Sequence, residues 1–193
     1  MMKTATLLLW TFLFFTPANS QNKRSAGKKA TGLNLAISAD AKIPVGDFSS
    51  THWGGIGLTA GPAMHTFRID HNRTLGFVYE AGIAHYLGKK ETVSGYPYKY
   101  PGYTFIHAYG GLSYYLPAYF EVRLCAGPAI GLYNGNSNFN LGASLTTNYH
   151  FGNRFSAGPS MTMMIDPGTN AIWAASLKAT IYFVRIPSGN PKF

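Results

Sequence analysis

LNLAISADAKI, residues 33–43, decides the fold, because its apolar and polar side chains alternate with a period of two. One face would carry Leu33, Leu35, Ile37, Ala39, Ala41 and Ile43, and the other Asn34, Ser38, Asp40 and Lys42. Successive side chains of a β-strand point to opposite faces, so this pattern predicts a strand with one apolar face. No stretch that follows shows a persuasive helical period.

Similar alternation recurs in about seven further segments, bounded by Gly, Pro and Asn turns. These segments are 56–64, 75–86, 103–116, 119–133, 139–151, 154–165 and 171–184. Short turns follow at 117–118 and 152–153, whereas 46–53 and 87–102 form longer loops. About eight strands with short connections predict an all-β fold, an antiparallel up-and-down barrel that leaves no exposed sheet edge.

The N-terminus has the layout of a cleavable secretory signal, with Lys3, an apolar run over 7–15 and the small residues Ala18-Asn19-Ser20. The run is short for a membrane-spanning helix, although a retained signal-anchor is the alternative. We therefore expect a signal peptide at 1–20, a basic flexible tail at 21–32, the barrel at 33–184 and a C-terminal tail at 185–193.

Charge and cysteine content limit the classes of protein. The formal net charge is +9, but Lys23, Arg24, Lys28 and Lys29 contribute much of it from one tail. An exported chain has little access to nucleic acid, so we expect no nucleic-acid partner and interpret the tail as solvated or, alternatively, as a docking segment. Cys125 is the single cysteine, which excludes a disulfide framework.

The charges within the predicted strands lie opposite the apolar row of their own strand. They are Asp40, Lys42, Glu80, Glu121, Arg123 and Lys178. Because a charge facing lipid near the midplane costs about 2–4 kcal/mol, this segregation predicts a transmembrane barrel with an inward polar face. Opposite charges in so narrow a lumen should pair, which predicts a filled, ion-paired interior and not an open pore.

Aromatic residues gather near the predicted strand ends, as the two interfacial girdles of a membrane barrel require. They include Phe77, Tyr103, Phe120, Phe139, Phe151, Phe155, Trp173 and Phe183. The core of a β-sandwich is the alternative. Prolines within three predicted strands, in the Ala-Gly-Pro triplets at 60–62, 126–128 and 157–159, predict local bulges or bends.

This pattern resembles the OmpX/OmpA-like family of small outer-membrane barrels of Gram-negative bacteria. The resemblance rests on the signal segment, on ADAKIPVGDF at 39–48, on GLSYYL at 111–116 and on ATIYF at 179–183. It implies a porin-like barrel in the outer membrane of the cell envelope. Members often end in an aromatic residue that the assembly machinery recognises, a role that Phe193 or Phe183 could fill.

The sequence offers no catalytic, cofactor or metal site. The histidines His52, His65, His71, His85, His107 and His150 show neither a His-x-Ser arrangement nor a compact metal-ligand spacing. Loop 87–102 is the most distinctive candidate contact surface, because it combines tyrosines with cations. Its candidate residues are Lys89, Lys90, Tyr96, Tyr98, Lys99 and Tyr100; alternatively, the tyrosines only sit at lipid headgroups.

We therefore predict a non-enzymatic outer-membrane protein that acts structurally or through its surface loops. Its partners would be outer-membrane lipid and an envelope protein, with the barrel itself a monomer. Two alternatives stay open: an accessory barrel of a secretion or transport complex, and a soluble secreted barrel that carries an apolar ligand.

Overall fold

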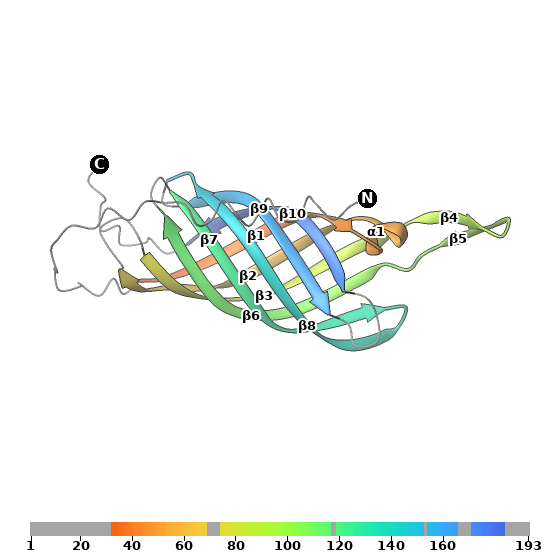
Figure 1. The fold of residues 1–193 in the computed structure, drawn as a ribbon, viewed down its shortest axis with the longest axis horizontal. Coiled ribbons are helices and arrows are strands. Elements are labelled where there is room, and N and C mark those ends of the chain that lie inside the picture. The colour runs from red at the N-terminus through yellow and green to blue at the C-terminus, as the bar shows by residue number, and fades with distance from the viewer. Residues whose placement is uncertain (1–31, 69–73, 117–118, 153, 166–170, 184–193) are drawn as a thin grey trace, which may run out of the picture.

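The computed structural model shows a closed barrel of antiparallel strands (Figure 1). It describes residues 32–68, 74–116, 119–152, 154–165 and 171–183. The predicted signal peptide, the basic tail up to residue 31 and the C-terminal tail lie outside the described residues. Within the described part of the chain, no helix has the length and apolar character needed to cross a membrane.

The chain runs through one short helix and ten strands in the described ranges. They are β1 (Gly32–Val45), α1 (Phe48–Thr51), β2 (His52–Arg68), β3 (Thr74–Gly88), β4 (Lys90–Val93), β5 (Tyr96–Lys99), β6 (Tyr103–Leu116), β7 (Phe120–Tyr133), β8 (Asn136–His150), β9 (Phe155–Ile165) and β10 (Ile172–Tyr182). Eight of them form the barrel in the order β1-β10-β9-β8-β7-β6-β3-β2. The barrel closes where β1 pairs with β10, from Ala36↔Tyr182 to Val45↔Trp173. This arrangement confirms the predicted fold class.

The two ends of the barrel differ. One end, the loop end, carries α1, the β4–β5 hairpin and the turn between β7 and β8 (Figure 1). The other, the turn end, lies where β6 meets β7 and β8 meets β9. The predicted loop 87–102 is thus largely a protruding two-stranded hairpin, turned at Ser94 and Gly95, both with positive φ.

The turn between β7 and β8 is tighter than the sequence interpretation expected. Asn134 and Gly135 have φ of 49° and 80°, the left-handed values of a two-residue hairpin turn. Strand β8 therefore begins at Asn136 and not at residue 139. Asn-Gly is the strongest short hairpin signal, and it was present in the sequence.

The predicted bulges at the three proline triplets are wrong. Pro62, Pro128 and Pro159 each keep a regular ladder with one neighbouring strand, opposite Leu35, Leu141 and Leu177. The ladder on the other side skips two residue pairs without a change of register. The register shifts of β2 lie instead at 52–54 and 65–67.

Glycine explains how a regular strand accommodates these prolines. At Gly61, Gly127 and Gly158 a carbonyl oxygen of the adjacent strand occupies the place where a Cβ atom would stand. Proline has no N–H to give its neighbour, and the preceding glycine lets that neighbour's backbone lie close. The missing hydrogen bond therefore affects one side of the strand and leaves its register unchanged.

The period-two pattern correctly separates the two faces of the strands. Along β1, Leu35, Ile37 and Ile43 are exposed on the outside, while Ser38 and Lys42 are buried inside. Tyr103 is an error of the girdle prediction, because it is only 7% exposed. It lies on the same side of β6 as the inward Phe105 and Tyr109 and packs inside the barrel.

Candidate functional site

The barrel interior holds the six charged residues that the sequence singled out. Asp40 and Lys42 lie on β1, Glu80 on β3, Glu121 and Arg123 on β7, and Lys178 on β10. All six are buried, with exposed fractions of 0–8%. They comprise three carboxylates and three cations, so their formal charges cancel.

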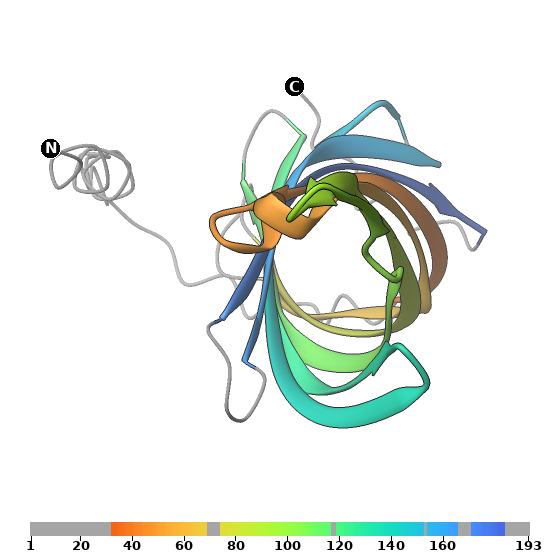
Figure 2. The same ribbon diagram turned by 90° about the vertical axis from the view of Figure 1, so that its right-hand side faces the viewer.

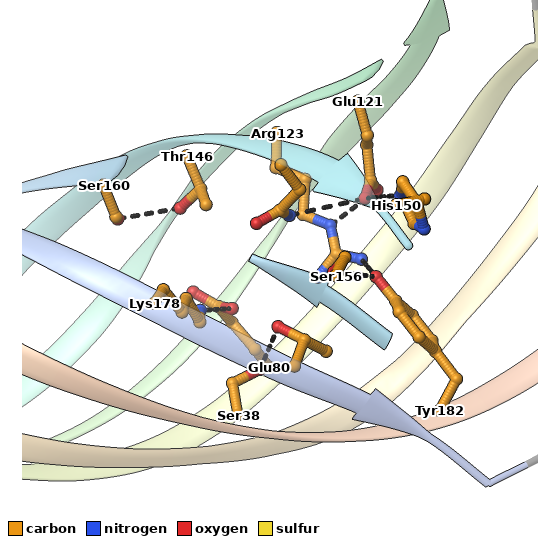
Figure 3. A network of polar contacts seen from close by, with 12 residues as sticks. Ser38, Glu80, Glu121, Arg123, Thr146, His150, Ser156, Ser160, Lys178 and Tyr182 are labelled. Atoms are coloured by element: carbon orange, nitrogen blue, oxygen red, sulfur yellow. Dashed lines mark hydrogen bonds and ion pairs between the residues drawn. The ribbon is translucent and has the colours of Figure 1, made fainter. Parts of the chain in front are cut away.

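Glu121 and Arg123 form the centre of a network near the turn end (Figure 3). The Arg123 Nε atom lies 2.6 Å from Glu121 Oε1, and Arg123 Nη2 donates to the Tyr182 hydroxyl at 2.6 Å. The second carboxylate oxygen of Glu121 lies 3.0 Å from His150 Nε2 and 3.4 Å from Asn148 Nδ2. Both oxygens of this fully buried carboxylate are thus hydrogen-bonded, as burial of a charge requires.

Glu80 and Lys178 join opposite sides of the lumen, from β3 to β10 (Figure 3). Lys178 Nζ donates to Glu80 Oε2 at 2.9 Å, and Ser144 on β8 donates to the other oxygen at 3.3 Å. Three strands that are not neighbours in the sheet therefore meet at one carboxylate.

Asp40 and Lys42 pair along a single strand, with Lys42 Nζ 2.6 Å from Asp40 Oδ2. These two residues, Glu80 and Lys178 line one small cavity of about 20 Å³. A site needs about 10–15 Å³ of such space to hold one water molecule. This cavity therefore accommodates water and not an organic ligand.

Neutral polar side chains fill the space between the charges. Ser38 bonds Thr180 at 2.9 Å and Thr146 bonds Ser160 at 2.8 Å, each pair joining two strands (Figure 3). The sequence interpretation missed Tyr182, His150 and Asn148 as partners of the Glu121–Arg123 pair. The signal was available, because Asn148 and His150 alternate with outward residues on β8, and Tyr182 lies on the same side of β10 as Lys178.

A tier of apolar and aromatic residues fills the interior at the loop end. Its buried members are Phe48, Ala84, Tyr86, Tyr103, Phe105, Met164, Ile172 and Ala174. Tyr103 stacks on Phe105 with ring centroids 4.3 Å apart and on Tyr133 at 5.6 Å. The interior is therefore layered, with this aromatic tier towards the loops and the ion pairs below it.

The hairpin residues proposed from the sequence divide between two faces. Lys90 lies opposite Lys99 in the ladder, and Val93 opposite Tyr96. Because cross-strand partners share a face and successive residues alternate, Tyr96, Tyr98 and Tyr100 lie on the face opposite that of Lys90 and Lys99. Tyr96 is 78% exposed, and Tyr98 meets Tyr100 edge-on at 4.9 Å.

Lys89, the sixth of these residues, is turned inward. It is half-buried, and its Nζ donates to the carbonyl oxygen of Ser49 in α1 at 2.5 Å. The expected single surface of tyrosines and cations is thus a tyrosine face and a lysine face, with Lys89 outside both.

The outer wall of the barrel is apolar. Every Asp, Glu, Lys or Arg of the eight barrel strands whose side chain is described is buried. The exposed positions carry aliphatic and aromatic side chains such as Ile56 at 70%, Leu124 at 60% and Leu177 at 64%. At the turn end, the ring of Tyr149 contacts the rings of both Phe120 and Phe151 on the rim.

The histidines of the described chain that bond a hydroxyl lie apart from the carboxylates. His52 bonds Thr51 and the carbonyl of Pro101, and His85 bonds Thr104. His150 does bond Glu121, but inside the ion-pair network. Among the described residues, no group of three or more His, Cys, Asp or Glu side chains could hold a metal ion.

No protein-family model and no curated protein sequence matches the chain. Solved structures do resemble it. The outer-membrane protein Ail of Yersinia pestis in a phospholipid bilayer nanodisc is 13% identical over 78% of this chain and 99% of Ail, with a TM-score of 0.49. A crystal structure of Ail, the attachment invasion locus protein, gives 10% identity over 81% and 100%, with a TM-score of 0.48.

Neisserial surface protein A is 10% identical over 78% of this chain and 95% of its own length, with a TM-score of 0.37. The predicted fold rests on the closed eight-stranded barrel of this chain itself.

Proposed function

We propose that the chain is an integral outer-membrane protein that is not an enzyme and conducts no solute, and that acts through the hairpins of its loop end or as a structural element of the envelope. The observation that carries this proposal is the apolar outer wall of the closed barrel. Outer-membrane lipid is the partner that this wall fits.

The distribution of charge supports a membrane position. A barrel in water would place Lys, Glu and Arg on its outer wall, whereas here the described charges of the eight barrel strands are inside. Monomeric soluble proteins rarely expose apolar patches larger than a few hundred Å², and this wall runs around all eight strands. The exposed charges Asp47, Lys90, Glu91, Lys99 and Arg154 lie at the two ends or on the hairpin.

The packing of the interior supports a barrel that conducts nothing. The buried charges are paired, the cavity among them has the size of a water molecule, and the aromatic tier lies between them and the loop end. A solute could pass only by breaking ion pairs whose separation leaves buried charges without partners. A filled interior instead makes the barrel a rigid support for its hairpins.

The hairpins are the parts best suited to meet a partner in the envelope or outside the cell. The tyrosine face of β4–β5 offers amphipathic rings with few rotatable bonds, which is the composition of many protein-binding surfaces. The β7–β8 hairpin adds exposed polar residues at the start of β8, Asn136 to Asn138. The barrel itself would be a monomer that is sealed by its β1–β10 pairing.

A single outward arginine tests the membrane position. Leu177 is 64% exposed in the middle of β10, next to the inward Lys178. Leu177→Arg should destabilise the barrel in lipid by about 2–4 kcal/mol, whereas Tyr96→Arg, on the hairpin, should not. The full chain should fractionate with outer membranes and migrate differently on a gel with and without boiling.

A soluble periplasmic product that tolerates Leu177→Arg would refute the membrane position. The filled interior is tested separately, by recording conductance after reconstitution of the purified barrel into planar bilayers. We expect no channel steps, and stable conductance would refute the claim that the barrel passes no solute.

A further inference from the structure

Helix α1 lies at the rim of the barrel mouth at the loop end (Figure 2). Its Phe48 side chain is 9% exposed and points into the aromatic tier, with ring centroids 5.0 Å from Tyr86 and 5.9 Å from Tyr103. The helix has four residues, far fewer than a helix needs to be stable by itself. Contacts with other segments must therefore determine its position.

Besides the ring contacts of Phe48, α1 and the residue that follows it, His52, are hydrogen-bonded to the two stems of the β4–β5 hairpin. On the entering stem, the backbone N–H of Lys89 donates to Thr51 O at 2.8 Å and its Nζ donates to Ser49 O at 2.5 Å. On the leaving stem, Pro101 O accepts a hydrogen bond from His52 Nε2 at 3.1 Å. The stems are joined by the bond from Tyr100 N to Lys89 O, at 2.9 Å.

The chemistry of these contacts explains why residue 89 is a lysine. The last carbonyl groups of a helix have no partner within it and need donors from elsewhere. Lys89 supplies two such donors, one from the backbone and one from the side chain. Because Pro101 O can only accept, His52 Nε2 carries the proton, and His52 Nδ1 then accepts from Thr51 Oγ1 at 2.8 Å.

We infer that α1 is a lid whose seated position is set by the stems of the β4–β5 hairpin, so that a partner that displaces the hairpin also releases Phe48 from the aromatic tier. This inference rests on the proposed function, because it takes the hairpin as the segment that meets a partner. Displacement of the hairpin would then be transmitted to α1 through Lys89.

Amide hydrogen exchange in the folded, detergent-solubilised full chain tests the link. The amides of Ser49 and Ser50 in the lid are bonded to Gly46 O and Asp47 O, in the turn that leads into it, and report its order. Lys89→Met keeps the apolar stem of the side chain and its backbone bond but removes the ammonium. Since an ammonium group makes a stronger hydrogen bond than a neutral donor, exchange at these amides should rise about tenfold or more.

Lys90→Met is the matched control, because the neighbouring lysine is exposed on the hairpin and should leave the exchange unchanged. The coupling between the hairpin and α1 is tested by attaching a bulky protein to the hairpin tip. Biotin attached at Tyr96→Cys, with Cys125→Ala to remove the native thiol, should leave the exchange unchanged until streptavidin binds, and should then raise it at Ser49 and Ser50 but not in β8.

Equal exchange in Lys89→Met and the parent chain would overturn the inference, as would a streptavidin load without effect on the lid. The same samples are checked for heat-modifiable mobility and membrane fractionation. If they insert as barrels but the lid does not respond, the inference alone fails. If the lid responds in a chain that does not enter membranes, the proposed function fails and the link stands.

Discussion

Replacing Arg123 by methionine measures how far the ion pairs inside the barrel stabilise it. Arg123 is 5% exposed, and its guanidinium bonds both the Glu121 carboxylate and the Tyr182 hydroxyl. Methionine keeps much of the side-chain volume and removes the charge. Glu121, which is 0% exposed, would then retain His150 and Asn148 as neighbours but lose its strongest partner.

The expected loss follows from the cost of an uncompensated buried charge. Removing one partner of a buried ion pair typically costs about 3–5 kcal/mol. Because two hydrogen-bond donors remain on Glu121, we expect the lower end, about 3 kcal/mol. The double variant Glu121→Gln with Arg123→Met removes the stranded charge as well and should recover a large part of this loss.

The free energy of unfolding would be measured by urea titration in detergent micelles, followed by gel mobility without boiling and by tryptophan fluorescence. Arg154→Met is the control, since Arg154 is exposed at the turn end and should change stability by less than about 0.5 kcal/mol. If Arg123→Met stays within that limit too, or if the double variant loses as much as the sum of the single ones, the ion-pair reasoning is wrong.

Three further outcomes are expected from the same titration. Tyr103→Ala should lose about 3–5 kcal/mol, because it empties the aromatic tier, whereas Tyr96→Ala at the exposed hairpin should be neutral; equal effects would contradict the interior assignment. Gly158→Ala should lose about 1–3 kcal/mol, since the new methyl group meets the Thr147 carbonyl oxygen, and an unaffected variant would rule out that close approach. Gly135→Val should lose about 1–2 kcal/mol, because φ is 80° there, and a neutral result would argue against the tight turn.

The period-two pattern was sufficient to predict the barrel, because an apolar outer face and a polar inner face impose alternation on every strand. It predicted the bounds of β6, residues 103–116, as they are found. It failed for Tyr103, because an aromatic residue at a strand end is equally compatible with an interfacial girdle and with a packed lumen. The position is decided by the side of the strand: Tyr103 lies on the same side of β6 as Phe105, and that side faces the interior.

Other parts of the candidate site depend on contacts between segments that are distant in the chain. The sequence placed Lys89 among the exposed loop residues, but its bond to Ser49 arises only when the β1–β2 and β3–β6 connections meet at the mouth. The division of the hairpin into a tyrosine face and a lysine face likewise follows from the ladder register, with Lys90 opposite Lys99. Composition alone could not distinguish these faces.

The ion pairs also differ in when they can form during assembly. Asp40–Lys42 and Glu121–Arg123 each join residues two apart on one strand, so each strand carries its own counter-charge before it has any neighbour. The Glu80–Lys178 pair connects β3 with the last strand, β10, across the lumen. It can exist only once the sheet has curled round to bring β10 against β1, which makes it a marker of the completed ring.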